Sequence, residues 1–260
     1  MRHYVLPGTY DRPCVIELSE QESKYITRVL RKRQGEHFTG VDARGNTVAL
    51  CVQSVEPGRC LLEITDVTPL TDVTETEDSM PAITLFQCLP KGNKMDLIIR
   101  QAVEAGVERI VPVLSSYSVP RIGTDGYEKK RERWMRIAKQ AMQQSGRKTM
   151  PEISVPEKIA ALPEVWSRYS NTEDVCLLFY ENQVSQLHLH RLLCSNLSSI
   201  GICIGPEGGF SSVEVTNLLN SGLHPVYINT NILRTETAAL YAVAAVQTVI
   251  LEKDSWNIRR

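Results

Sequence analysis

Residues 199–214 read SIGICIGPEGGFSSVE, and this stretch decides the fold of the C-terminal part of the chain. An apolar run without charges ends at Ile204, and a turn with three glycines follows it. Ser211 and Glu214 then have the spacing of a capping box, which begins a helix. A buried apolar strand that leads through a glycine turn into a helix is typical of a parallel α/β sheet.

The glycine turn is a candidate ligand loop. Gly205, Gly208 and Gly209 allow the backbone to turn sharply and to approach a ligand closely. In an open α/β sheet, ligands bind beyond the carboxyl ends of the strands, where this turn lies. The turn has neither a P-loop nor a Gly-x-Gly-x-x-Gly pattern, and the carboxylate of Glu207 would repel a phosphate. It favours a polar or cationic ligand, although an ordinary strand-to-helix turn has the same spacing.

A second polar segment precedes the last helix of the chain. Residues 229–231 are Asn, Thr and Asn, and Arg234 and Glu236 follow at the start of a helix predicted over 236–252. Glu236 is favourable there because it meets the positive end of the helix dipole. The helix is apolar around most of its circumference, which predicts burial in a core or a subunit interface. A salt bridge together with an N-cap would account equally well for Arg234 and Glu236.

The pattern around these segments alternates between strands and helices, which predicts an α/β domain with a mostly parallel sheet. Strands are predicted over residues 83–90, 109–114, 175–180, 199–205 and 225–229. Helices are predicted over residues 96–105, 127–145, 184–194, 212–220 and 236–252. Gly106 and Gly146 are predicted to end the first two helices.

The N-terminal part has a different pattern, with short strands and one helix, and predicts a small β-barrel-like module. The helix begins at Ser19, buries Ile26, Val29 and Leu30, and ends at Gly35. A hairpin turn is predicted at residues 40–46 and a strand at 61–67.

An acidic segment framed by prolines, residues 68–81, separates the two patterns and has the composition of a linker. We therefore predict a barrel domain at residues 1–70, a linker at 71–81 and an α/β domain at 82–260. A long surface loop within one domain would have the same composition.

Composition excludes several classes of protein. The seven cysteines are scattered without a Cys-x-x-Cys pair. His188 and His190 are two residues apart, so on a helix they would point in different directions and could not bind one ion, and we predict no metal site. No stretch approaches the ~20 apolar residues of a membrane span, and the N-terminus lacks a signal core, which predicts a cytoplasmic protein with no membrane partner.

The net charge of −1 argues against general nucleic-acid coating but leaves room for RNA binding through local basic faces. One such face lies in the N-terminal helix, and others lie on and after the helix predicted over 127–145. The basic residues are Arg28, Arg31, Lys32 and Arg33, then Lys129, Arg133 and Arg136, then Arg147 and Lys148. Solvated helix surfaces explain these residues equally well.

The chain resembles one family over nearly its whole length: the bacterial small-subunit ribosomal RNA uracil-N3 methyltransferases of the SPOUT superfamily. The stretches that carry the resemblance occur in the family's order. They are RVLRKRQGE (28–36), KGNKMDLIIRQAVEAGVERIVPV (91–113), RWMRIAKQAMQQSGRKTMPEI (133–153), IGPEGGFSSVE (204–214) and ILRTETAAL (232–240). The resemblance implies a PUA-like β-barrel, followed by a SPOUT domain that is tied in a deep trefoil knot and forms a homodimer through the knot.

The resemblance also implies a site for S-adenosylmethionine, made by three loops at residues 179–182, 205–210 and 228–238. The implied cofactor-binding residues are Phe179, Tyr180, Glu181, Gly205, Pro206, Glu207, Gly208, Gly209, Ile228, Asn229, Ile232, Leu233, Arg234, Thr237 and Ala238. For methylation at uridine N3, Arg234 is the candidate catalytic residue that stabilises negative charge on the uracil oxygen, and Glu236, or alternatively Glu207, is the candidate that organises the loop or helps the proton leave. RNA contacts are expected at Arg28, Arg31, Lys32, Lys91 and Arg147. The implied partner is 16S ribosomal RNA in the small subunit or its precursor, and no DNA.

Three places depart from the family's usual pattern. Residues 228–231 replace a Leu-Gly-x-Arg, so that Asn231 stands in place of an arginine. Tyr25 stands where a histidine is common, and Tyr117 where an arginine is usual. The alternatives to this function are a SPOUT methyltransferase with another RNA target, such as a ribose 2′-hydroxyl, and a non-catalytic RNA-binding ribosome-assembly factor.

Overall fold

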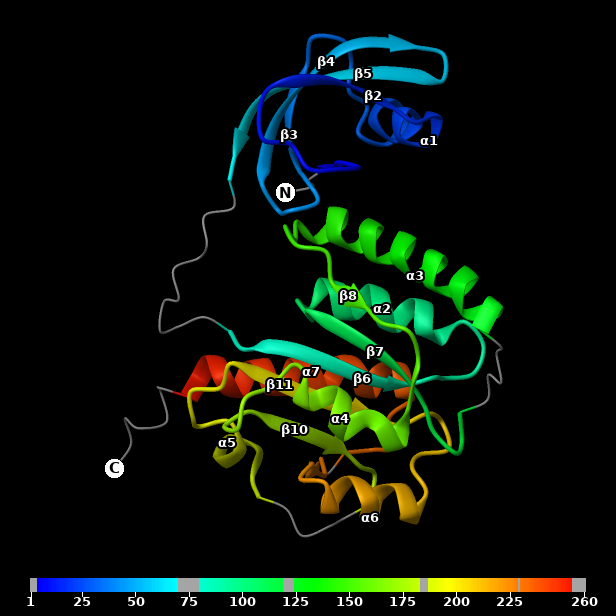
Figure 1. Ribbon diagram of the computed structural model, residues 1–260, viewed down its shortest axis with the longest axis vertical. Coiled ribbons are helices and arrows are strands. Elements are labelled where there is room, and N and C mark those ends of the chain that lie inside the picture. The colour runs from blue at the N-terminus through cyan, green and yellow to red at the C-terminus, as the bar shows by residue number, and fades with distance from the viewer. Residues whose placement is uncertain (1–3, 70–79, 119–123, 183–186, 229, 254–260) are drawn as a thin grey trace. The chain divides into compact units, whose positions relative to one another are not determined.

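The computed structural model describes residues 4–69, 80–118, 124–182, 187–228 and 230–253 (Figure 1). The chain forms two compact units: Met1–Glu77 with Met142–Met150, and Asp78–Ala141 with Pro151–Arg260. Of the segment predicted as a linker, only residues 80 and 81 lie within the described part of the chain.

The first unit is built on a five-stranded sheet in the order β1-β3-β4-β5-β2. The strands are β1 (Tyr4–Val5), β2 (Cys14–Leu18), β3 (His37–Val41), β4 (Thr47–Glu56) and β5 (Arg59–Thr68). β1 pairs with β3 in parallel, and the other neighbours are antiparallel. Alternate side chains of β4 and β5, among them Leu50 and Leu62, fill the core of this unit.

The hairpin predicted at residues 40–46 is confirmed, since β3 and β4 pair across it. Asp42 explains the turn: its carboxylate accepts hydrogen bonds from the backbone N–H groups of Arg44 and Asn46. An aspartate that binds the backbone two residues ahead in this way stabilises a tight turn.

The N-terminal helix differs from the prediction after its first turn. Ser19 caps α1 (Glu20–Lys24), as predicted, but the chain then continues as a π-helix over Tyr25–Val29 and does not run on to Gly35. The wider turn shifts the following side chains, so the i, i+3, i+4 spacing no longer marks the buried face. Ile26 is buried, whereas Val29, predicted as buried, is 53% exposed.

The second unit contains the predicted parallel sheet, in the order β12-β10-β11-β6-β7-β8, with β9 also paired to β7. Its strands are β6 (Ala82–Cys88), β7 (Arg109–Leu114), β8 (Glu152–Ile153), β9 (Glu157–Lys158), β10 (Val175–Phe179), β11 (Ser199–Ile204) and β12 (His224–Val226). Every described pairing in this sheet is parallel. All six residues of β11 are buried, which explains its unbroken apolar run.

The helices of the second unit cover both faces of this sheet. They are α2 (Lys94–Glu104), α4 (Leu162–Ser167), α5 (Leu189–Leu192), α6 (Ser212–Asn220) and α7 (Thr235–Glu252), with a 3₁₀ turn at Ile159–Ala161. A further helix, α3 (Thr124–Ser145), belongs to the second unit up to Ala141 and to the first unit from Met142. Figure 1 shows α4 in front of the sheet and α7 behind it. α2 packs against α7, and α4 and α6 share a core with β6 and β10.

The α/β fold with a parallel sheet is thus confirmed, with differences at short elements. β8, β9 and α4 were not predicted, α5 is shorter than the predicted helix over 184–194, and β12 ends at Val226. Gly106 and Gly146 follow α2 and α3 with positive φ, as predicted.

In the described part of the chain, no helix is long and apolar enough to span a membrane.

Candidate active site

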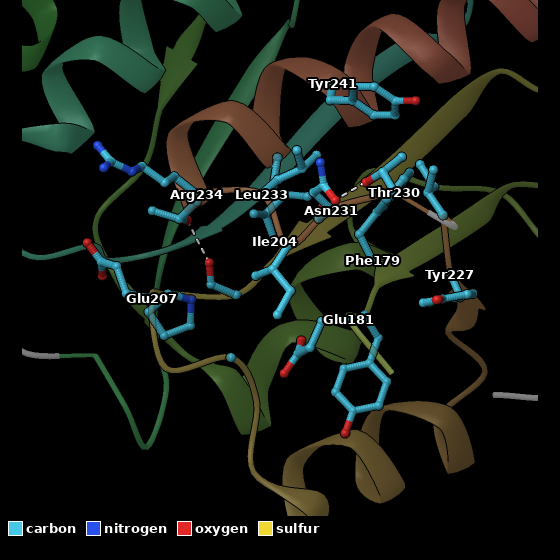
Figure 2. Close-up of a pocket in the computed structure, with 18 of the residues that line it drawn as sticks. Phe179, Glu181, Ile204, Glu207, Tyr227, Thr230, Asn231, Leu233, Arg234 and Tyr241 are labelled. Carbon is cyan, nitrogen blue, oxygen red and sulfur yellow. Dashed lines mark hydrogen bonds between the residues drawn. The ribbon is translucent and has the colours of Figure 1, made fainter. Parts of the chain in front are cut away.

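A cavity of about 470 Å³ lies at the carboxyl ends of β10, β11 and β12 (Figure 2). Three segments line it: residues 179–181 from the end of β10, residues 204–209 from the end of β11, and, from the end of β12 into α7, residues 226–228, 230–235, 238 and 241. In a parallel sheet the carboxyl ends of neighbouring strands meet at one edge, and this brings together segments that are far apart in the sequence.

The structure brings most of the predicted cofactor-binding residues to this cavity. Those that line it are Phe179, Tyr180, Glu181, Gly205, Pro206, Glu207, Gly208, Gly209, Ile228, Ile232, Leu233, Arg234 and Ala238. Asn229 lies outside the described residues. Thr237 does not line the cavity and is exposed.

Three of the lining residues lie on one face of α7. Residues three and four apart share a helix face, so Arg234, Ala238 and Tyr241 point to the cavity together. Thr237 is three residues from Arg234 and four from Tyr241, so its spacing also fits this face, but its side chain is exposed and does not line the cavity. The same spacing could have identified Tyr241, which the sequence-based prediction missed. Ile204, Val226 and Tyr227 are further lining residues that it missed, whereas Thr230, Asn231 and Thr235 lie within the predicted loop at 228–238 but were not named as cofactor-binding residues.

Two glycines of the turn after β11 are required by their surroundings. Gly209 has φ +67°, and a Cβ there would collide with the carboxylate of Glu181. A Cβ on Gly208 would lie 3.0 Å from the Cβ of Tyr117. Glu181 and Tyr117 therefore pack directly on the turn, and Tyr117 reaches it from the segment after β7.

The predicted capping box at the start of α6 is confirmed and anchors the other end of this turn. Ser211 accepts a hydrogen bond from the Glu214 N–H, and the Glu214 carboxylate accepts one from the Ser211 N–H at 2.8 Å. The Ser116 N–H also donates to Glu214, at 2.7 Å. Burial alone would raise the pKa of Glu214, but these hydrogen bonds hold it below its ordinary value.

Thr235, the first residue of α7, ties the helix to the glycine turn. Its hydroxyl donates to the carbonyl of Gly205 at 2.7 Å and accepts from the side-chain amide of Gln87, on β6, at 3.0 Å. Thr235 and Gln87 are both buried. This chain of hydrogen bonds fixes two walls of the cavity to the central strand β6.

Two lysines outside the cavity, Lys94 and Lys91, contact the Glu207 carboxylate. The sequence did not predict these contacts. The carboxylate lies 2.8 Å from Nζ of Lys94 and accepts from the Lys91 N–H at 3.2 and 3.3 Å. Partial burial raises the pKa of Glu207, but the hydrogen bonds from Lys94 and from backbone N–H groups, with the charge of Lys94, together outweigh it, so the net direction is down. The hydrogen-bonding capacity of the Glu207 carboxylate is therefore used by Lys94 and by the Lys91 backbone.

Arg234 and Glu236 have separate surroundings. Glu236 lies 3.4 Å from Nζ of Lys94 and is 14% exposed. Arg234 is the N-cap residue of α7, is exposed, and makes no side-chain capping hydrogen bond. Figure 2 shows it beyond the start of α7, on the same side of the cavity as Glu207. The sequence left a salt bridge with an N-cap as the alternative to a functional role for Arg234 and Glu236. Glu236 does form a salt bridge, but with Lys94.

Comparison with known proteins agrees with this geometry. Residues 76–247 match the family described as an RNA methyltransferase domain. The ribosomal RNA small subunit methyltransferase E of Aquifex aeolicus is 34% identical over 239 residues, which cover 90% of this chain and 94% of that protein. The chain belongs to this family.

Two further similarities extend over most of the chain. The ribosomal RNA small subunit methyltransferase E of Bacillus subtilis is 29% identical, over 91% of this chain and 92% of that protein. The crystal structure of the Neisseria gonorrhoeae protein of the same name, described as bound to S-adenosyl methionine, has a TM-score of 0.78 and 29% identity. The match covers 96% of this chain and 98% of that one.

The predicted RNA-binding residues of this family member lie in both units. Arg28 and Arg31 are exposed on the first unit, and Arg31 has the left-handed φ of +53°. Lys32 lies over the ring of Phe38, 5.7 Å from its centroid. Lys91 is exposed on the second unit.

Two further basic side chains have partners within the chain. Arg147 donates to the carbonyl of Thr149 at 2.8 Å. Arg133, on the second predicted basic face, forms an ion pair with Asp96.

Tyr25, one of the departures from the family pattern, stacks on Tyr4 with ring centroids 6.2 Å apart and packs against the barrel core.

The described residues contain no cluster of His, Cys, Asp and Glu that could hold a metal ion. His188 and His190 were expected to point in different directions, but their rings stack 5.5 Å apart. The reason is that His188 precedes α5 with an extended backbone, so the two residues do not share a helix.

Proposed function

We propose that this protein transfers a methyl group from S-adenosylmethionine to N3 of a uridine in small-subunit ribosomal RNA. The observation that carries the proposal is the three-walled cavity at the carboxyl edge of the sheet, in a member of a family with a relative described as bound to S-adenosyl methionine. Because the substrate is ribosomal RNA, we expect the protein to act in the cytoplasm.

The cavity suits the cofactor in size and chemistry. Its volume of about 470 Å³ lies within the range of small-molecule sites. Glycines at 205, 208 and 209 let backbone groups approach a ligand without intervening side chains. Phe179, Leu233 and Ala238 offer apolar surface to the adenosine part, and the Glu181 carboxylate is compatible with a cationic ligand.

S-adenosylmethionine supplies an activated methyl group on a cationic sulphur, so the protein's task is mainly to place the uracil ring against it. N3 of uridine carries a proton at neutral pH, and negative charge develops on the uracil oxygens as that proton leaves. Arg234, exposed at the rim of the cavity, is placed to donate hydrogen bonds to such an oxygen. Glu207 and Glu236 are both paired with Lys94, which favours an organising role for them over proton transfer.

We further propose that residues 1–70 form a PUA-like barrel that binds RNA, that residues 71–81 link it to the α/β domain, and that residues 82–260 form a knotted SPOUT domain. The resemblance to the family supports the knot. The exposed Arg28 and Arg31, with Lys32, support phosphate binding on the barrel, and Lys91 and Arg147 are the remaining proposed contacts. An arginine held in a left-handed conformation is strained, and such strain is concentrated at functional sites.

The second unit is proposed to form a homodimer through α7. One stripe of this helix is exposed although it is largely apolar. Residues of this stripe lie three or four positions apart, as expected for one face of a helix. They are Thr237, Leu240, Tyr241, Ala244, Thr248 and Leu251. Tyr241 also lines the cavity, so a second copy on this stripe would adjoin the cofactor site.

Nucleosides of ribosomal RNA from a strain that lacks the gene test the proposed function. Loss of 3-methyluridine, restored by the wild-type gene, is the expected result. Loss of a 2′-O-methyl nucleoside would instead show a different target. An unchanged set of nucleosides, together with no calorimetric binding of S-adenosylmethionine, would favour a non-catalytic assembly factor.

The role of Arg234 is tested by Arg234→Ala under single-turnover conditions with saturating cofactor. We expect a rate about 100-fold lower, as for the loss of one donor to a developing oxyanion. A wild-type rate in this variant would remove Arg234 from the mechanism.

A further inference from the structure

The position of Lys94 is not explained by the helix that it begins. Lys94 is the first residue of α2, and a cation at a helix N-terminus meets the positive end of the helix dipole. The capping position before it, Asn93, makes no side-chain capping hydrogen bond. Local helix stability therefore disfavours a lysine here, and its contacts outside α2 must account for it.

Those contacts are two carboxylates: Glu207 lines the cavity, and Glu236 lies in the first turn of α7, beside the lining residues Arg234 and Thr235. Nζ of Lys94 lies 2.8 Å from Oε1 of Glu207, in the turn after β11, and 3.4 Å from Oε2 of Glu236, in the first turn of α7. The side chains are 33%, 24% and 14% exposed, respectively, so solvent screens these pairs only in part. Lys94 itself does not line the cavity.

The second carboxylate depends on the lysine most strongly. Oε2 of Glu236 is buried and has no hydrogen-bond partner among the described residues, so the ion pair with Lys94 is its principal compensation. Without the lysine, the buried carboxylate of Glu236 at the start of α7 would stand close to Glu207 in the glycine turn with no cation between them. Like charges at such a distance repel each other and disfavour the arrangement.

We propose that Lys94 is a positioning residue for the cofactor: it holds the glycine turn and the start of α7 together by binding one carboxylate from each. Its effect on the reaction passes through Glu207 and Glu236, and it touches neither cofactor nor RNA. This inference rests on the proposed function, because it assumes that the cavity binds S-adenosylmethionine.

Titration calorimetry with S-adenosylmethionine tests the inference on the full-length protein. We expect Lys94→Met to weaken binding about tenfold, and Lys94→Arg, which keeps the charge, to stay within about threefold of wild type. Lys158→Met serves as the matched control, because Lys158 is an exposed lysine on β9 away from the cavity. It is expected to bind as wild type does.

A double variant distinguishes positioning from a general loss of structure. Glu236→Gln removes the buried charge that Lys94 compensates, so Lys94→Met/Glu236→Gln is expected to bind more tightly than Lys94→Met alone. In methyl transfer, Lys94→Met should raise KM for the cofactor and leave kcat nearly unchanged. A defect that came only from poor folding would lower the fraction of active protein, and with it the apparent kcat, and would leave KM for the cofactor unchanged.

The outcomes separate the inference from the function on which it rests. If wild-type protein does not bind S-adenosylmethionine, the proposed function fails. If wild type binds and Lys94→Met binds equally well, or if the double variant binds no better than the single one, the positioning role of Lys94 is wrong and the proposed function stands.

Discussion

At the residue scale, the site depends on long-range contacts that no local pattern encodes. The glycine turn could be identified from sequence because glycine has a direct conformational meaning. Lys94 could not be identified, because its partners Glu207 and Glu236 are 113 and 142 residues away. The hydrogen bond between Thr235 and Gly205 was hidden for the same reason.

Gly209→Ala tests whether the turn is built for a ligand. The variant forces a side chain into a left-handed conformation, at a cost of about 1–2 kcal/mol in the free energy of unfolding. It also displaces the carboxylate of Glu181, so we expect a lower melting temperature and weaker binding of S-adenosylmethionine.

Gly222→Ala is the matched control. Gly222 has a similar φ of +92°, nothing lies within 4 Å of its Cβ position, and it does not line the cavity. It should lose comparable stability and keep full cofactor affinity. Equal affinity losses in the two variants would show that the effect of Gly209→Ala comes from destabilisation alone.

At the element scale, strands and helices with a strong pattern were predicted well and short elements were not. The buried strands and the capping box of α6 follow from composition and spacing. The two-residue strands β8 and β9 are too short to show a period, and the π-helix at Tyr25–Val29 changes the period itself. The Val29 prediction failed for that reason.

Glu214→Ala tests the contribution of the α6 capping box. It removes a buried carboxylate that accepts hydrogen bonds from Ser116 and Ser211, and we expect a loss of about 2 kcal/mol in the free energy of unfolding at pH 7. Because the folded-state pKa of Glu214 is lowered, this stabilisation is complete above its ordinary value of 4.5. It declines as the pH falls through the lowered pKa.

Urea unfolding of wild type and variant at several pH values measures the effect. The difference in the free energy of unfolding should shrink below pH 4.5. Glu214→Gln, which keeps the shape but not the charge, should lose less stability than Glu214→Ala at neutral pH. A difference that is independent of pH would contradict the role of the charge.

At the scale of the whole molecule, the pattern of strands and helices predicted the α/β architecture. The expectation of a knot and of a dimer came from the family resemblance alone. The proposed knot and the proposed dimer are properties of chain path and assembly, which spacing does not encode. The apolar circumference of α7 left open whether it faces a core or a subunit interface. In the structure, one side of α7, with Ala242 and Val246, is buried in the core, and another side, the stripe around Leu240 and Ala244, is exposed.

Leu240→Asp tests the proposed dimer. Placing a charge in the apolar stripe should shift the protein from a dimer to a monomer of 29.2 kDa in analytical ultracentrifugation. Val155→Asp, at an exposed valine away from α7, should remain dimeric. A monomeric wild-type protein, or a dimer that persists in Leu240→Asp, would contradict assembly through this stripe.

The most direct test of the central claim is methyl transfer to isolated small ribosomal subunits from a strain that lacks the gene, with naked ribosomal RNA for comparison. Purified protein and methyl-labelled S-adenosylmethionine are added, and the RNA nucleosides are identified by mass spectrometry. The account predicts labelled 3-methyluridine in the small-subunit RNA. No transfer to either substrate, or label only in a ribose 2′-O-methyl group, would contradict it.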